Sequence, residues 1–100
     1  MEKRKIYFDK AEVMLLIPDK DVNFNLLSND INRIQFEKCK EYKLGFIPID
    51  SEQITISSSK LPYTISYTKG NNKKYFEDYK KEFEEYAKTY NVTFGDTTKA

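Results

Sequence analysis

A single amphipathic helix near the C-terminus is the feature of this sequence that most restricts its fold. At about 100° per residue, the aromatic residues and one alanine between residues 72 and 90 fall inside an arc of roughly 120°, and the charged residues lie outside it. The arc consists of Tyr75, Phe76, Tyr79, Phe83, Tyr86, Ala87 and Tyr90. Asn72 is suited to cap the first turn, and Asn91 to end the helix in the left-handed conformation. The pattern predicts a helix over residues 72–90 with one buried face.

The segment that precedes this helix has the composition of β-strands. Between Lys5 and Thr68, short runs rich in Ile, Val, Tyr, Phe and Thr alternate with polar or proline-containing breaks. We expect about six or seven strands, within residues 6–8, 12–17, 22–26, 33–40, 44–49, 54–57 and 63–68. A run of strands followed by one terminal helix predicts a mainly β fold. In it a curved antiparallel sheet, or a partly open barrel, is capped by the helix.

Length and composition indicate one domain over residues 1–100, with a core from about 5 to 94 and a polar tail over 95–100 that is expected to fray. Hydrophobic residues make up 39% of the chain and aromatic residues 15%, which is not the composition of a disordered protein. The 17 basic and 16 acidic residues give a net charge of +1. Such a balance provides no overall field that would attract nucleic acid or an anionic membrane.

Three parts of the sequence carry a resemblance to a known family. They are Asn29–Ile34 at the entry to a central strand, Ile54–Ile56, and the helix segments Tyr75–Lys80 and Phe83–Ala87. Because of these parts and the order in which they occur, residues 5–90 resemble the small bacterial pleckstrin-homology-like domains. The resemblance implies two orthogonal sheets capped by a C-terminal helix. The chain lacks the helix tryptophan and the Lys-x-Arg pair of the first hairpin that are typical of eukaryotic members, so binding of phosphoinositides is not implied.

Several classes of chemistry are disfavoured by the residues. The chain has no histidine, which removes the usual activation of serine and cysteine nucleophiles and the commonest metal ligand. Asp19–Asn23 matches only the start of a calcium loop, because Phe24 stands where that loop needs glycine. The glycines Gly45, Gly70 and Gly95 are too far apart to form a phosphate loop. We therefore expect a protein that is not an enzyme, with no catalytic residues, cofactor or metal.

Cys39 and the N-terminus bear on the compartment. A single cysteine cannot form an intramolecular disulfide, which favours the cytoplasm as the compartment. Cys39 itself is either a buried cysteine of a strand, which is the simpler interpretation, or a reactive thiol. The basic start Lys3-Arg4-Lys5 is followed by Asp9 and Lys10 instead of a long apolar run, so no secretory leader and no membrane insertion are expected.

Two short segments are candidate binding sites. Lys3, Arg4 and Lys5 form a local basic cluster, which is either a contact for phosphate or a membrane surface, or a solubilising end. Ser57, Ser58 and Ser59 form a polar segment between two strands, which is either an ordinary loop or a rim where a partner's strand adds to a sheet edge. We expect a non-enzymatic binding or assembly module whose partner is another protein or a second copy in a homo-oligomer. The alternative is a weak binder of anionic lipid or nucleic acid through local Lys/Arg clusters, although nucleic acid is not the expected partner because acidic residues intersperse the helix lysines.

Overall fold

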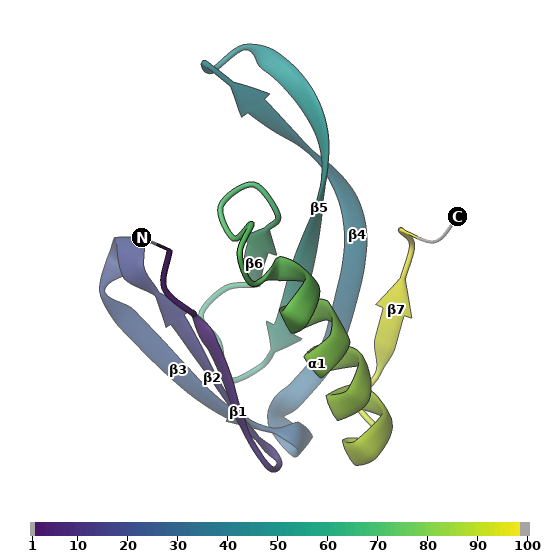
Figure 1. Ribbon diagram of the computed structural model, residues 1–100. Helices are drawn as coiled ribbons and strands as arrows, with labels where there is room; N and C mark the ends of the chain where they lie inside the picture. Colours follow the sequence, from purple (N-terminus) through teal and green to yellow (C-terminus); the bar gives the residue numbers. More distant parts are fainter. Residues whose placement is uncertain (1, 99–100) are drawn as a thin grey trace.

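Two β-sheets and one helix make up the fold in the computed structural model, which describes residues 2–98 (Figure 1). One sheet has the strand order β1-β2-β3 and contains β1 (Ile6–Asp9), β2 (Glu12–Ile17) and β3 (Val22–Leu27). The other has the order β6-β5-β4-β7 and contains β4 (Ile31–Lys43), β5 (Ile47–Ser58), β6 (Ile65–Thr68) and β7 (Phe94–Asp96). Helix α1 spans Phe76–Tyr90. The predicted mainly β architecture with one C-terminal helix is confirmed, but within the described residues the two sheets do not close into a barrel.

The connections between the first strands lie in the polar or proline-containing breaks between the apolar runs. Lys10, between β1 and β2, has a φ of 55°, and Asp21, before β3, has a φ of 51°. Short 3-10 helices at Pro18–Lys20 and Ser28–Asp30 lead into β3 and β4. The turns at Lys10 and at Pro18–Asp21 reverse the direction of the chain, so β1 pairs with β2, and β2 with β3, in antiparallel register.

The core lies where α1 meets both sheets. Phe83 is fully buried, and its ring contacts that of Phe8 on β1 edge-to-face at 4.9 Å between centroids. Tyr79, also fully buried, contacts Tyr67 on β6. The buried face of α1 is Phe76, Tyr79, Phe83, Tyr86 and Ala87, all members of the predicted aromatic arc. The helix therefore joins the two sheets through aromatic contacts.

The helix begins later than predicted. It starts at Phe76, not at residue 72, and Tyr75 is its N-cap without a side-chain capping bond. Asn72 is buried, and its side chain is already engaged: the amide donates to the Thr68 carbonyl oxygen and the amide oxygen accepts a hydrogen bond from Lys5 Nζ. At the other end the prediction is confirmed, because Asn91 adopts the left-handed conformation with a φ of 56° and its N–H bonds to the Ala87 carbonyl.

The middle of the second sheet differs from the expected pattern. The apolar run 44–49 was predicted to be a strand, but Leu44–Phe46 is a turn, and Ile47 begins one long strand that continues to Ser58. Strands β4 and β5 form a hairpin that extends well beyond β6 and β7 (Figure 1). We call residues 38–52 the arm.

Residues 94–96 also depart from expectation. The sequence placed residues from 95 onward in a fraying tail, whereas Phe94–Asp96 forms β7 and pairs in parallel with β4 from Ile34 to Phe36. The Phe94 ring packs edge-to-face on Phe36 at 4.8 Å, which gives this short strand an apolar anchor. Lys99 and Ala100, the end of the predicted tail, lie outside the described residues.

Candidate functional site

The N-terminal basic cluster contributes to internal contacts of the fold. The Arg4 guanidinium forms an ion pair with Glu82 of α1, donates to the Ile6 carbonyl at 2.8 Å, and lies 5.4 Å from the centre of the Tyr79 ring. The Lys5 N–H donates to the Tyr79 hydroxyl at 2.7 Å. Lys3 is exposed. Arg4 and Lys5 thus fasten the N-terminal segment to the helix, and only Lys3 points its charge into solvent.

A substitution pair separates these roles. Arg4→Gln should lower the free energy of unfolding by about 1 kcal/mol, because it removes a half-buried ion pair and the cation over the tyrosine rings. Lys3→Gln removes the same charge from an exposed position and should change stability by less than about 0.5 kcal/mol. Urea unfolding of both variants measures the difference, and equal effects would contradict the structural role of Arg4.

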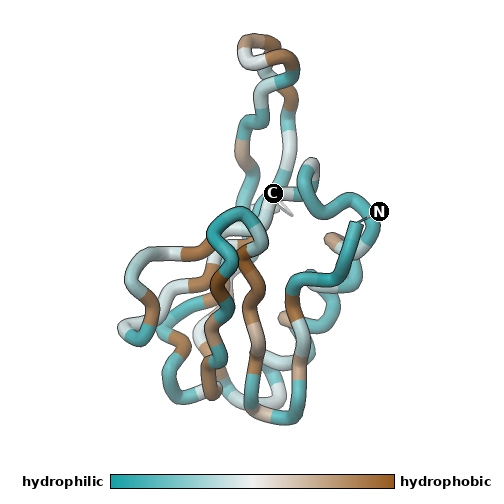
Figure 2. The backbone as a smooth tube through the Cα atoms, turned by 90° about the vertical axis from the view of Figure 1, so that its left-hand side faces the viewer, coloured by the Kyte–Doolittle hydropathy of each residue, from teal (hydrophilic) through white to brown (hydrophobic). Residues whose placement is uncertain are grey.

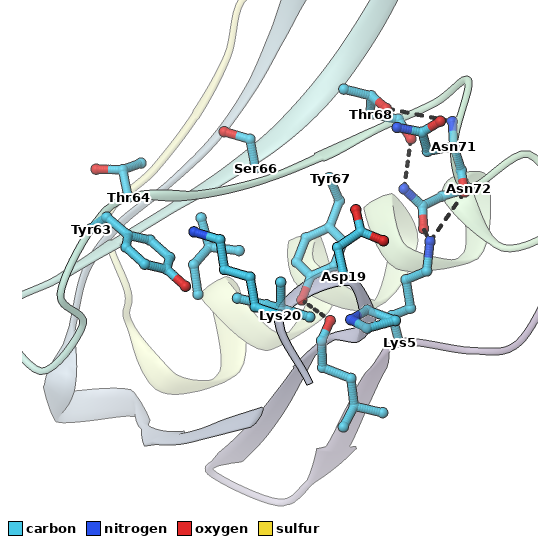
Figure 3. Close-up of a pocket in the computed structure, with 14 residues that line it drawn as sticks. Lys5, Asp19, Lys20, Tyr63, Thr64, Ser66, Tyr67, Thr68, Asn71 and Asn72 are labelled. Atoms are coloured by element: carbon cyan, nitrogen blue, oxygen red, sulfur yellow. Dashed lines mark hydrogen bonds between the residues drawn. The ribbon is translucent and has the colours of Figure 1, made fainter. Parts of the chain in front are cut away.

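Lys5 lies at one end of a cleft between β6 and the turn that follows β2 (Figure 3). The cleft has a volume of about 520 Å³, and its walls include Leu16–Lys20 and Tyr63–Thr68. Lys5 Nζ donates to the Asn72 side-chain oxygen at 2.8 Å and to the Asn71 carbonyl at 3.1 Å, and the Tyr67 hydroxyl donates to the Leu16 carbonyl at 2.9 Å. Lys20 stands 4.0 Å from the centre of the Tyr63 ring. Hydrogen bonds within the cleft are thus concentrated at the end near Lys5, where they join Lys5, Thr68, Asn71 and Asn72 (Figure 3).

The serine segment closes a turn. Ser57 lies in β5 opposite Arg33, and Ser58 donates its hydroxyl to the Asp30 carbonyl and accepts the Lys60 N–H at 3.0 Å. Ser59 is exposed in the turn. The structure places Ser58 at the start of β4. Among the contacts of the described residues, the serine segment and the basic cluster have no hydrogen-bond partner in common. Within residues 2–98, no group of three acidic or cysteine side chains is placed to hold a metal ion.

The largest exposed apolar feature is the end of the arm. Leu44 is 76% exposed, Phe46 72%, Tyr42 63%, Ile49 44% and Ile47 41%. Tyr42 pairs with Pro48, whereas Ile47 and Ile49 pair with Lys43 and Glu41 on the alternate positions, so the apolar side chains occupy both faces of the hairpin. We call these five residues the arm tip; Figure 2 shows the apolar colour at its end.

The turn at the arm tip has a strained residue. Leu44 and Gly45 have φ values of 55° and 82°, and the Phe46 N–H bonds to the Lys43 carbonyl at 3.2 Å. Positive φ at both central positions is the signature of a type I′ turn, which favours Asn-Gly. A leucine in this conformation costs about 1 kcal/mol or more relative to glycine. Leu44 is therefore unfavourable for the backbone as well as for solvation.

Polar contacts hold the base of the arm. Glu41 accepts hydrogen bonds from the Ser51 hydroxyl and from the Gly70 N–H, the latter at 2.9 Å, and the Ser51 bond is the main cause that lowers the pKa of Glu41. Lys80 of α1 pairs with Glu52 at 2.9 Å, and Lys40 pairs with Asp50 across the two strands. These contacts fix the direction in which the arm leaves the body.

Cys39 lies within the arm and is half-buried. Burial raises the pKa of its thiol, and the carboxylates of Glu41 and Glu37 act in the same direction. A raised pKa keeps the thiol protonated at neutral pH, which is the opposite of what a cysteine nucleophile requires. The chemistry of Cys39 in this position favours a structural residue.

Sequence reasoning missed the arm tip as a site. The signal was present, because Gly45 interrupts an apolar run that is too short to be a buried helix, yet an apolar run is also the pattern of a buried strand.

No helix within residues 2–98 has the length and apolarity to cross a membrane. Comparison with models of protein families, with curated proteins and with solved structures finds no match to this chain.

Proposed function

We propose that this chain is a non-enzymatic protein-association module whose contact element is the arm tip. The observation that carries the proposal is the exposure of Tyr42, Leu44 and Phe46 at the end of a hairpin that the body leaves uncovered. A cluster of exposed apolar side chains of this kind marks interaction sites in soluble proteins. A two-stranded hairpin is also marginally stable in water by itself, so a bound partner would stabilise the arm.

Leu44 strengthens the case for a partner. Asparagine or glycine would suit its backbone conformation better, and a polar side chain would suit its exposure. A residue that is unfavourable on both counts in the isolated domain is explained if its side chain is buried in a complex. Local rules of sequence and structure are most often broken at functional positions.

The arm favours a protein over a lipid bilayer. Beyond β6 and β7 both of its strands have an unpaired edge, and open sheet edges are not tolerated in the hydrocarbon region of a membrane. Its charges also balance, so the arm offers no cationic excess toward anionic lipid. They are Lys38, Lys40 and Lys43 against Glu41, Asp50 and Glu52.

The pleckstrin-homology-like relationship is part of the same proposal. Two sheets with a C-terminal helix packed between them support it, as does the aromatic seam of that helix. Arg4 and Lys5 are engaged in internal contacts, which argues against a head-group site at the N-terminal cluster. Within this fold the association surface would be the arm, with a cytoplasmic protein as partner.

A pair of leucine substitutions tests the proposal. Leu44→Asn should raise the free energy of unfolding by about 0.5 to 1 kcal/mol, because asparagine tolerates the left-handed conformation, while it removes the most exposed apolar side chain of the arm tip. Leu27→Asn, at a leucine on the body that is 53% exposed, is the matched control. Thermal or urea unfolding gives the stability of each variant.

The binding experiment compares the same proteins as immobilised baits for an extract of the native cell. We expect proteins that are retained by the wild type and by Leu27→Asn, and lost from Leu44→Asn. Equal retention by all three would remove the arm tip from the proposal. Sedimentation of the wild type with phosphatidylserine vesicles, abolished by Leu44→Asn, would assign the tip to a membrane surface instead.

A further inference from the structure

The outer edge of β4 is unpaired along the arm. The Ile34 N–H donates to the Thr93 carbonyl, and the Phe36 carbonyl accepts the Thr97 N–H, so the backbone groups at these positions face β7. Because backbone direction alternates with a period of two, the N–H and C=O groups of Lys38, Lys40 and Tyr42 face the same side. Pairing with β7 ends at Phe36, and no other described strand covers this edge.

The opposite edge of the arm is less suited to strand addition. The Glu52 carbonyl accepts the Lys69 N–H, so Glu52, Asp50 and Pro48 direct their backbone groups away from β4. Proline has no N–H to donate, and it is found on strand edges where it blocks pairing. Of the two edges, that of β4 is the one with donors and acceptors along its whole free length.

We propose that this edge pairs with the same edge of a second copy, in an antiparallel ladder centred on Lys40. This inference rests on the association function proposed above, and it identifies the partner as a second copy of the chain. The free edge runs from residue 37 to 43, between the end of β7 and the turn at Leu44. Two such segments overlap along their full length only when Lys40 faces Lys40 of the partner subunit. The contact is isologous, so it closes on itself as a dimer.

Side-chain chemistry is consistent with this register. Glu37 lies opposite Lys43 of the partner subunit, which gives an opposite-charge pair at each end of the ladder. Lys38 lies opposite Tyr42 of the partner subunit, where the lysine stem and the ring can pack together. The two copies of Lys40 meet at the centre, and each is already paired with Asp50 of its own chain, which offsets their repulsion.

Two proline variants test which edge is used. Lys40→Pro and Asp50→Pro remove the same Lys40–Asp50 ion pair and insert the same residue, one on each outer edge. Lys40→Pro should weaken self-association by at least about tenfold, whereas Asp50→Pro should dimerise like the wild type. The measurement is solution mass by light scattering and sedimentation, at protein concentrations up to about 1 mM, the weak end of specific affinities.

A cross-link tests the register without placing a proline in either strand of the arm. In this ladder residue 41 faces Cys39 of the partner subunit as a non-hydrogen-bonded pair, whose Cα atoms lie about 4.5 Å apart, within disulfide range. Glu41→Cys should therefore form a covalent dimer on mild oxidation. Wild-type Cys39 is offset from its own copy by two residues, about 7 Å along the strand, and should not cross-link. Lys43→Cys is the control that should stay uncross-linked.

The outcomes separate this inference from the proposed function. A wild type with the monomer mass of 11.9 kDa at every concentration overturns self-pairing, as does equal weakening by the two proline variants. In that case, retention of a different protein by the wild type and not by Leu44→Asn would leave the arm tip as an association site. A dimer lost only in Lys40→Pro, with a cross-link only in Glu41→Cys, supports the ladder.

Discussion

Phe83→Ala is expected to lower the free energy of unfolding by about 3 to 5 kcal/mol, the largest effect of any substitution considered for this protein. The Phe83 side chain has no exposure to solvent, and its ring packs edge-to-face on Phe8 of β1. Truncation leaves a cavity where α1 meets the sheet, and the aromatic neighbours cannot close it without leaving their own contacts. Urea unfolding followed by far-UV circular dichroism measures the loss.

The matched control is Phe46→Ala at the arm tip. Phe46 is 72% exposed, so its truncation should change stability by less than about 0.5 kcal/mol. A loss below about 1 kcal/mol for Phe83→Ala would mean that α1 does not seal the two sheets, and the description of the core would have to be revised.

The helix was predictable because its burial follows from local periodicity. The residues that recur at helical spacing, such as Tyr79, Phe83 and Tyr86, are the ones buried in the structure. Its start was not predictable in the same way. Asn72 has the right chemistry for a cap, but its side chain bonds to Thr68 at the end of β6 and to Lys5, which is distant along the chain. Tertiary contacts displaced the helix start to Phe76.

The arm was not predictable because its apolar residues have the local sequence pattern of a buried strand but are exposed in the folded protein. Residues 44–49 read as a buried strand, yet the structure has no second layer over them. The same difficulty applies to β7, whose three residues pair in parallel with residues of β4 that lie 60 positions earlier. Pairing at such separation depends on the folded arrangement of β4 and α1, and composition does not reveal it.

Some features of the candidate sites could be read from the sequence, and others only from the fold. Charge identified Lys3, Arg4 and Lys5 as a cluster, but only the fold shows that Arg4 bonds to Glu82 and Lys5 to Asn72. The arm tip was inconspicuous in the sequence, since exposure is a property of the assembled sheet. The polar candidates were thus easy to notice, but Arg4, Lys5 and Ser58 form hydrogen bonds within the fold, whereas the exposed apolar residues are the better binding candidates.

Alkaline pH should unfold this protein through its buried tyrosines. Burial raises the pKa of Tyr86 to about 12, and burial also raises the pKa of Tyr67 and of Tyr79. The unfolded chain ionises near the ordinary tyrosine value of 10.0, so above this pH the folded state binds more protons than the unfolded state. The free energy of unfolding is therefore insensitive to these groups below pH 10. It falls as the pH rises toward 12, by no more than about 1.4 kcal/mol per pH unit for each phenol.

Tyrosinate absorbance and far-UV circular dichroism, recorded together during an alkaline titration, check this expectation. Tyr67, Tyr79 and Tyr86 should ionise together with the loss of the native spectrum. Tyr86→Phe removes one raised pKa, so its stability should decline less steeply above pH 10. It also removes the hydrogen bond from the Tyr86 hydroxyl to the Ala11 carbonyl, at a cost of about 1 kcal/mol at neutral pH. If Tyr67, Tyr79 and Tyr86 ionised while the dichroism stayed native, their phenols would be open to water, and the aromatic seam between the helix and the two sheets would not exist as described.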